Sequence, residues 1–327
     1  MKFSLSDEQQ AFAEAIDGLL TSADSVAANR AWAAGDHAPG LKIAERLAEL
    51  GLPALLVPEE VGGIGGSALD LAVAFEVLGR HAVAGPWIET VAVAPTLLAA
   101  AGQDEVLSGL AEGERRVSLT AGSFAPYALD ADVATDVYDL SGETLSLGAV
   151  GEARDSVDHS RHLFVTTQGD EVATVAPEAA ARALDLGSLA ASAMLLGASE
   201  KMLEITVEYL KQRKQFGRVV GEYQALKHMA ADIKVGVDFA RPLVHGAAVA
   251  LDAGDPDAAR AVSAAKVFAS DTAVLASRNA LQLHGAIGYT MECDLSVWFL
   301  RARALVSAWG TPHFHRTRIL NSVMEGR

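Results

Sequence analysis

The sequence YLKQRKQFGR at residues 209–218, followed by EYQALKH at residues 222–228, decides the fold most directly. A helix is expected to end at this basic segment, because apolar residues recur at helical spacing before it. These residues are Leu189, Ala193, Leu196, Leu203, Val207 and Leu210. Arg213 then lies at a helix C-terminus, where the macrodipole favours a cation, and its guanidinium could hold a pyrophosphate with two hydrogen bonds. On composition alone, Lys211, Arg213 and Lys214 are better described as a solvated helix end.

The elements along the chain are helical, then β, then helical again. Ser6 and Gln9 form a capping box that opens a helix, and another helix is expected over residues 41–50. Short stretches bounded by Gly, Asp and Ser predict strands at residues 117–120, 133–140, 144–147, 163–166 and 172–175. We therefore expect a mostly α fold with a small β domain. Its three parts are a helical domain at 1–112, a reduced middle β domain at 113–182 and a helical bundle at 183–327.

Composition and charge restrict the classes of function. The chain has 327 residues, of which 21% are charged, and a single cysteine, Cys293, which excludes a disulfide framework. Its formal net charge of −16 argues against nucleic acid as a partner. Residues 1–20 are polar and acidic and lack the apolar core of a signal peptide, and no segment predicts a membrane span. We expect a soluble, cytoplasmic protein.

Three stretches resemble the acyl-CoA dehydrogenase family: the segment around Arg213, Phe216 and Gly217, the sequence QLHGAIGYTME at residues 282–292, and, more weakly, VPEEVGG at residues 57–63. The resemblance covers most of the chain and is poorest in the β part. It implies a three-part fold ending in a four-helix bundle, and FAD shared across a subunit interface. The residues that it implies for the ADP part of FAD are Arg213, Gln215, Phe216, Gln224, Gln282, His284 and Gly285.

The sequence departs from the family where the chemistry takes place. The family's base is a glutamate, because removing the α-proton of a thioester requires an ionised carboxylate within reach. One of its two usual positions precedes Gly-Thr and is Trp309 here, and the other is Gly187. No tryptophan occurs between Trp87 and Trp298, so the flavin-ring pocket is expected to be incomplete. We therefore expect no catalytic residue in this chain.

Few other acids or histidines could replace the missing base or form a metal site. Asp185 and Glu200 are the acids that remain as candidates for a displaced base. His313 and His315 lie two apart beside Thr311, and no third ligand has suitable spacing, so no metal site is expected.

The resemblance is closest to the short, non-catalytic β-type subunits of actinobacterial α2β2 acyl-CoA dehydrogenases. It implies a full-length α-type partner that supplies the glutamate, the flavin pocket and most acyl-CoA contacts, and a bulky substrate such as a steroid side-chain CoA thioester. Three alternatives stay open. They are a self-sufficient homo-oligomeric dehydrogenase with a displaced base, a flavin monooxygenase or oxidase, and a non-catalytic acyl-CoA-binding scaffold.

Overall fold

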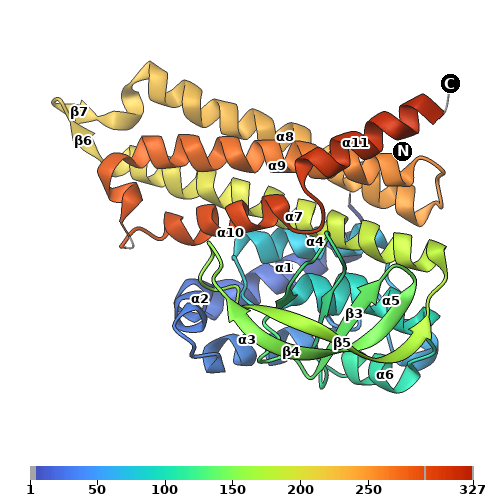
Figure 1. Ribbon diagram of the computed structural model, residues 1–327. Coiled ribbons are helices and arrows are strands. Elements are labelled where there is room, and N and C mark those ends of the chain that lie inside the picture. The colour runs from blue at the N-terminus through green and yellow to red at the C-terminus, as the bar shows by residue number, and fades with distance from the viewer. Residues whose placement is uncertain (1–4, 291, 326–327) are drawn as a thin grey trace.

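The computed structural model describes residues 5–290 and 292–325. Long helices of the C-terminal part lie side by side, and the N-terminal helices and the sheet pack against one side of this bundle (Figure 1). Helices, a small sheet and helices follow one another along the chain. The expected mostly α fold with a small β domain is confirmed.

Side-chain caps set the beginnings of N-terminal helices. The Gln9 N–H donates to Ser6 Oγ, and the Gln9 side chain accepts from the Ser6 N–H, so the predicted capping box is confirmed. Ser67 and Asp70 form a second one. The elements are α1 (Asp7–Ser22), α2 (Ser25–Ala33), α3 (Ala38–Glu49), η1 (Glu59–Val61), α4 (Ala68–Arg80), η2 (Ile88–Val93), α5 (Ala94–Ala100) and α6 (Asp104–Ala111).

The sheet has the strand order β1-β3-β4-β5-β2, in which β1 and β3 are parallel and the other pairs antiparallel. Its strands are β1 (Val117–Thr120), β2 (Ala128–Leu129), β3 (Asp136–Ser141), β4 (Thr144–Arg154) and β5 (Leu163–Thr174). The stretches 163–166 and 172–175, expected as separate strands, lie almost entirely in the single strand β5. The reason is that β4 pairs with β5 from Leu163 to Thr174, across the Gly169 and Asp170 that suggested a turn.

The C-terminal part is built around α7, which contacts both α8 and α9. By length and composition α7 could span a membrane, but 78% of its apolar window is buried inside the structure, as in the core helix of a bundle. The expected boundary between residues 182 and 183 falls inside this helix. The elements are α7 (Pro177–Gln212), β6 (Lys214–Gln215), β7 (Arg218–Val219), η3 (Val220–Glu222), α8 (Gln224–Asp252), α9 (Ala258–His284), η4 (Gly285–Tyr289), α10 (Leu295–Ser307) and α11 (Pro312–Glu325).

Two glycines let α4 and α7 touch through their backbones. A Cβ on Gly79 would lie 2.2 Å from Met194 O, and a Cβ on Gly197 would lie 1.9 Å from Glu76 O. Any side chain at either position would separate the helices. The N-terminal part is therefore fixed directly on the core helix of the bundle.

A buried arginine joins all three parts of the chain. Arg301 in α10 is ion-paired with Asp158 between β4 and β5, and it donates to Val83 O at 2.8 Å and to Ser160 Oγ at 2.9 Å. Burial alone would raise the pKa of Asp158, but the Arg301 charge and the Ser160 hydroxyl leave it lowered. The loop before β5 is thus held against α10.

Candidate functional site

The predicted Arg213 segment forms an exposed hairpin at one end of the bundle. Helix α7 ends at Gln212, as the sequence indicates, and Arg213 is its C-cap. Strands β6 and β7 then pair around Phe216 and Gly217, whose φ angles are +53° and +79°. The Phe216 side chain is 90% exposed, although a left-handed conformation is unfavourable for a residue of this size. An exposed phenylalanine held in this way indicates a surface for another molecule.

The second predicted segment lies at the same end of the bundle. The Tyr209 ring in α7 stacks on the His284 ring in α9, with centroids 4.5 Å apart, and the Tyr209 hydroxyl donates to His284 O at 3.3 Å. Gly285 follows with φ +65°, and no atom lies within 4 Å of where its Cβ would be. The structure therefore brings the two motifs together, although about 70 residues separate them in sequence.

The predicted cofactor residues differ in exposure. Four polar side chains are exposed: Arg213, Gln215, Gln224 and Gln282. The His284 ring is buried instead, because it packs under Tyr209 and its Nδ1 lies 2.8 Å from Ala280 O. Burial lowers the pKa of His284, which keeps the ring neutral. Its contribution is to hold the end of α9 in place, and the outward-facing groups are its neighbours Gln282 and Gly285.

Trp309 is fixed in a buried loop between α10 and α11. It has φ +56° and is 1% exposed. Its N–H donates to Phe124 O at 2.9 Å, and its carbonyl accepts from Ser188 Oγ at 2.9 Å and from His315 Nε2 at 3.0 Å. Burial lowers the pKa of His315 to about 4, so that the imidazole stays neutral. The loop is thus tied to the β domain, to α7 and to α11.

A buried lysine holds the same loop from the other side. The Lys266 side chain in α9 is fully buried, and its Nζ donates to the carbonyls of Leu305, Val306 and Gly310 at 3.1, 3.1 and 3.2 Å. These oxygens lie at and just beyond the C-terminus of α10, where a cation is favoured and free carbonyls need a partner. Trp309 therefore occupies a fixed position.

Gly187 lies directly under the Trp309 ring. A Cβ on Gly187 would lie 2.6 Å from Trp309 Cε3 and 2.8 Å from its Cδ2. The two positions at which a glutamate was expected are thus neighbours in space, and the indole fills the volume between them.

The two acids considered as substitutes are both paired with arginines. Asp185 forms an ion pair with Arg318, which contacts both of its carboxylate oxygens. Glu200 Oε1 accepts from Arg241 at 3.1 Å, and its Oε2 lies 3.4 Å from Arg80. Both carboxylates are already engaged by arginine donors, so neither is free to remove a proton from carbon.

Sequence reasoning missed a third acid. Glu89 lies in η2, a π-helical turn, and lines a cleft of about 370 Å³ together with Arg161, Phe124 and Trp309. Its side chain is 2% exposed, and its Oε2 has no hydrogen-bond partner among the described residues. Burial raises the pKa of Glu89 to about 7, against the opposing charge of Arg161. The signal in the sequence was a lone acid within an apolar run at residues 87–94, a feature that commonly marks function.

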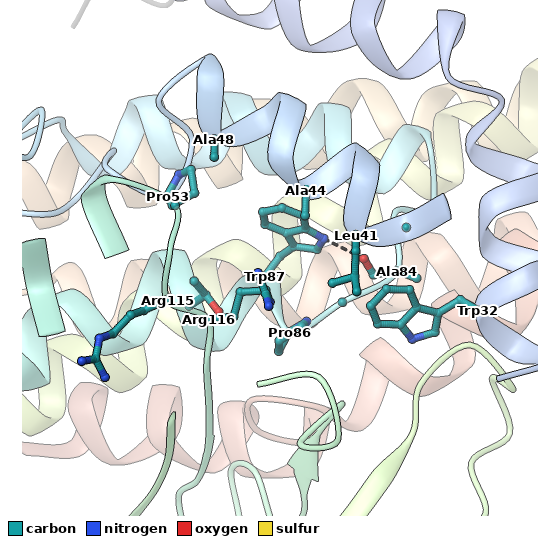
Figure 2. Close-up of a pocket in the computed structure, with 14 residues that line it drawn as sticks. Trp32, Leu41, Ala44, Ala48, Pro53, Ala84, Pro86, Trp87, Arg115 and Arg116 are labelled. Atoms are coloured by element: carbon teal, nitrogen blue, oxygen red, sulfur yellow. Dashed lines mark hydrogen bonds between the residues drawn. The ribbon is translucent and has the colours of Figure 1, made fainter. Parts of the chain in front are cut away.

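A second cavity lies between α3 and the segment around Trp87 (Figure 2). Its volume is about 30 Å³, room for roughly one water molecule. The Trp87 indole N–H is already satisfied by Ala84 O at 2.8 Å. This cavity is too small for an acyl chain, whereas the Trp309 cleft is about 370 Å³.

Comparison with known proteins assigns the family. Residues 6–114 match the N-terminal domain of acyl-CoA dehydrogenases and residues 178–324 match their C-terminal domain. Acyl-CoA dehydrogenase IpdE2 of Mycobacterium tuberculosis is 32% identical over 323 residues, covering 98% of each chain. The chain belongs to the acyl-CoA dehydrogenase family.

Solved structures show the same fold at lower identity. A variant of the Tcur3481-Tcur3483 steroid ACAD superposes with a TM-score of 0.89 at 22% identity, covering 99% of both chains. The ChsE4-ChsE5 complex from Mycobacterium tuberculosis gives a TM-score of 0.85, also at 22% identity and 99% coverage of both chains. Both names describe assemblies of two different chains.

The residues present fit one half of the family's cofactor. The exposed Arg213 side chain forms no hydrogen bond or ion pair within residues 5–290 and 292–325, and Gly285 leaves open space beside it in the same surface region. A free guanidinium and an accessible backbone are suited to binding a pyrophosphate. The exposed Phe216 ring is suited to packing on a neighbouring ring of the cofactor. In the cleft at Trp309 an indole occupies one of the positions predicted for the base.

Proposed function

We propose that this chain is the non-catalytic subunit of a heteromeric FAD-dependent acyl-CoA dehydrogenase. It would pair in the cytoplasm with a full-length α-type dehydrogenase as an α2β2 assembly and lend residues to the FAD of that partner. The partner would supply the catalytic glutamate, the flavin-ring pocket and most contacts with acyl-CoA.

The contact between Trp309 and Gly187 carries the proposal. The Trp309 indole, which cannot accept a proton, covers both positions proposed for the family's base. The Arg213 hairpin stays exposed at the other end of the bundle. A chain that had lost its function altogether would have no reason to keep an exposed phenylalanine in a left-handed turn. The chain lacks the base but has an exposed surface suited to FAD. This combination supports a role in which it lends residues to the cofactor of its partner.

Each residue at the exposed edge has a separate task. When bound, FAD would supply the two-electron acceptor for α,β-desaturation. Arg213 would hold the pyrophosphate with its fork of donors, and Phe216 would cover an adjoining ring. Gln215, Gln224 and Gln282 would add hydrogen bonds, and Gly285 would let the backbone come close to a phosphate oxygen. His284 would keep the end of α9 in register through its stack on Tyr209.

A bulky acyl-CoA is the proposed substrate, with a steroid side-chain CoA thioester as the leading candidate. The support is that Tcur3481-Tcur3483 is named a steroid ACAD and shares the fold. One plugged acyl site per pair of subunits would also leave more room beside the remaining site.

Glu89 favours a second candidate, a self-sufficient homo-oligomer with a displaced base. It is an acid with an unpartnered oxygen that lines the Trp309 cleft, and burial raises its pKa to about 7, a suitable value for a general base. This candidate requires the chain alone to complete a flavin pocket.

The deciding experiment compares the chain purified alone with the chain co-expressed with a full-length dehydrogenase. Bound FAD is quantified after denaturation, and oxidation is measured with a steroid side-chain CoA thioester and with a straight-chain acyl-CoA. The proposal predicts about one FAD per pair of subunits and activity in the co-complex alone. If the isolated chain holds FAD and oxidises an acyl-CoA, the lending role is wrong. Loss of that activity in Glu89→Gln would then identify the base.

A further inference from the structure

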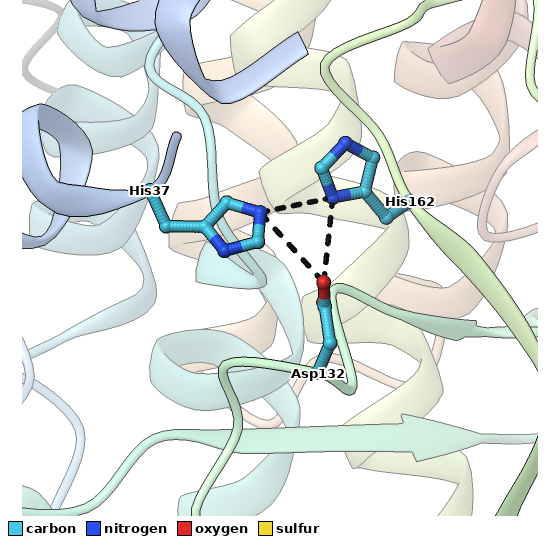
Figure 3. Close-up of side chains that lie close together, drawn as sticks. All are labelled: His37, Asp132 and His162. Atoms are coloured by element: carbon cyan, nitrogen blue, oxygen red, sulfur yellow. Dashed lines mark hydrogen bonds and ion pairs between the residues drawn. The ribbon is translucent and has the colours of Figure 1, made fainter. Parts of the chain in front are cut away.

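His37, Asp132 and His162 form a compact group where α3 meets the β domain (Figure 3). His37 Nε2 lies 3.2 Å from His162 Nδ1, and Asp132 Oδ2 lies 3.7 Å from each of these nitrogens. Their side chains are 20%, 33% and 22% exposed in chain order, so the group is sheltered but reachable from solvent. It belongs neither to the Arg213 hairpin nor to the Trp309 cleft.

Three separate segments hold these side chains in place. His37 is the N-cap residue of α3, and its ring packs on Trp32 with centroids 4.6 Å apart. His162 comes directly before β5, and its backbone N–H donates to Asp130 Oδ1 at 3.0 Å. Asp132 follows in the connection between β2 and β3.

The fully buried Asp130 lies beside the group formed by His37, Asp132 and His162. Its Oδ1 also accepts from the Trp32 indole at 3.1 Å and lies 3.7 Å from His162 Nδ1. Its Oδ2 is buried and has no hydrogen-bond partner in the part of the chain that the structure describes, an arrangement that needs an explanation in a native protein. Asp130 Oδ1 faces the same ring nitrogen of His162, Nδ1, as Asp132 does, so it adds a second carboxylate beside the group.

The spacing of the three atoms suits a metal ion. A tetrahedral zinc site has bonds of about 2.0–2.1 Å to nitrogen and oxygen, so its ligand atoms lie about 3.3 Å apart. The two nitrogens already have this separation, and Asp132 needs to move by only a few tenths of an ångström. Two imidazoles and a carboxylate are ligands typical of zinc and its transition-metal neighbours, with a fourth position left for water.

We propose that His37, Asp132 and His162 bind a divalent transition-metal ion of the zinc class, which ties the N-terminal helical part to the β domain. The ion joins segments that are distant in sequence, and so it stabilises the folded chain. None of these three residues is among those predicted to hold FAD. The pair His313 and His315 does not compete with it, because His315 is buried against Trp309 and His313 is exposed.

The test is a Zn²⁺ titration of the chelator-treated protein, in whichever assembly the full chain purifies. Bound zinc is measured by calorimetry and by elemental analysis, and Tm is followed in parallel. We expect about one zinc per chain and a Tm that rises with zinc. Replacement by Co²⁺ is expected to give the visible absorption of a tetrahedral site.

Variants assign the binding to this group. His37→Ala and His162→Ala are expected to weaken zinc binding by roughly tenfold or more and to remove the rise in Tm. His159→Ala is the matched control, because His159 is an exposed histidine close to His162 in sequence. Asp132→Asn keeps the size of the side chain and serves if an alanine variant does not fold. The proposal fails if the wild-type chain binds no zinc, or if His37→Ala and Asp132→Asn bind it as tightly as His159→Ala.

Discussion

The indole of Trp309 lies against the backbone of Gly187, so closely that a Cβ on Gly187 would come within 2.6 Å of the ring. These are the two positions at which the resemblance to acyl-CoA dehydrogenases predicts the catalytic base. The ring at 309 excludes any side chain at 187, because a Cβ there would overlap the indole. A glutamate at 187 therefore also requires a smaller residue at 309.

Gly187→Ala is expected to destabilise the chain by roughly 1–3 kcal/mol, because the new methyl group overlaps the Trp309 ring. In a Trp309→Leu background the same change is expected to cost about 1 kcal/mol less. Urea unfolding of the four proteins measures this coupling. Gly18→Ala in α1 is the control: it has no neighbour within 4 Å and is expected to stabilise by about 0.5–1 kcal/mol. Equal effects of Gly187→Ala in both backgrounds would mean that the two residues do not interact.

Lys266→Met removes the amine donor that holds the loop around Trp309. Three buried carbonyls then lose their donor, so we expect a loss of roughly 3–5 kcal/mol in the free energy of unfolding. Chemical denaturation measures this change. Lys234→Met is the matched control, because Lys234 pairs with Asp238 at the surface and its removal is expected to change stability by less than about 1 kcal/mol. Similar losses in the two variants would contradict the role given to Lys266.

Glu89 is expected to make the stability of the chain depend on pH. Its pKa is raised from 4.5 to about 7 in the folded state, so the unfolded chain loses this proton first. The folded state therefore loses stability as the pH rises from about 4.5 to about 7, and the loss levels off above that range at on the order of 3 kcal/mol.

Glu89→Gln isolates this contribution. The variant is expected to be more stable than the wild type at pH 8 and to lose the advantage towards pH 4.5, as measured by urea unfolding across the range. The lowered pKa of His315 acts in the opposite direction, but it is common to both proteins and cancels in the comparison. A difference that does not vary with pH would show that the Glu89 carboxyl is not held in its neutral form.

Phe216→Ser tests what the exposed hairpin is for. The side chain is 90% exposed, so its loss is expected to leave the stability of the isolated chain within about 0.5 kcal/mol of the wild type. In the co-complex the same change is expected to lower the bound FAD. A destabilised chain with normal flavin content would mean that Phe216 serves the fold and not the cofactor.

The fold could be predicted from the sequence because its signals are local. The capping box of Ser6 and Gln9, the end of α7 at Gln212 and the helical apolar spacing each depend on residues within a few positions of one another. The same local signals failed in the sheet. Whether Gly169 and Asp170 form a turn or continue β5 depends on pairing with β4, which a stretch of sequence does not contain.

The parts of the candidate site around Arg213 and Gln282 could be predicted, because each lies in a recognisable sequence motif. His37, Asp132 and His162 come from segments with no shared pattern, so only the fold brings them together. Glu89 was missed because a single acid among apolar residues has no spacing to recognise, and its burial follows from the packing of η2 against Trp309 and its surroundings. The inward turn of His284 likewise follows from its stack on Tyr209.

The central claim is most directly tested by the FAD content of the co-complex when Arg213 of this chain is changed. Arg213→Ala is expected to empty the complex of flavin without separating the subunits, and Arg213→Lys is expected to restore it only in part, because lysine lacks the fork of donors. Lys211→Ala is the matched control, since Lys211 lies on the same helix end but pairs with Glu208. If Arg213→Ala retains as much FAD as Lys211→Ala, this chain does not lend its residues to the cofactor.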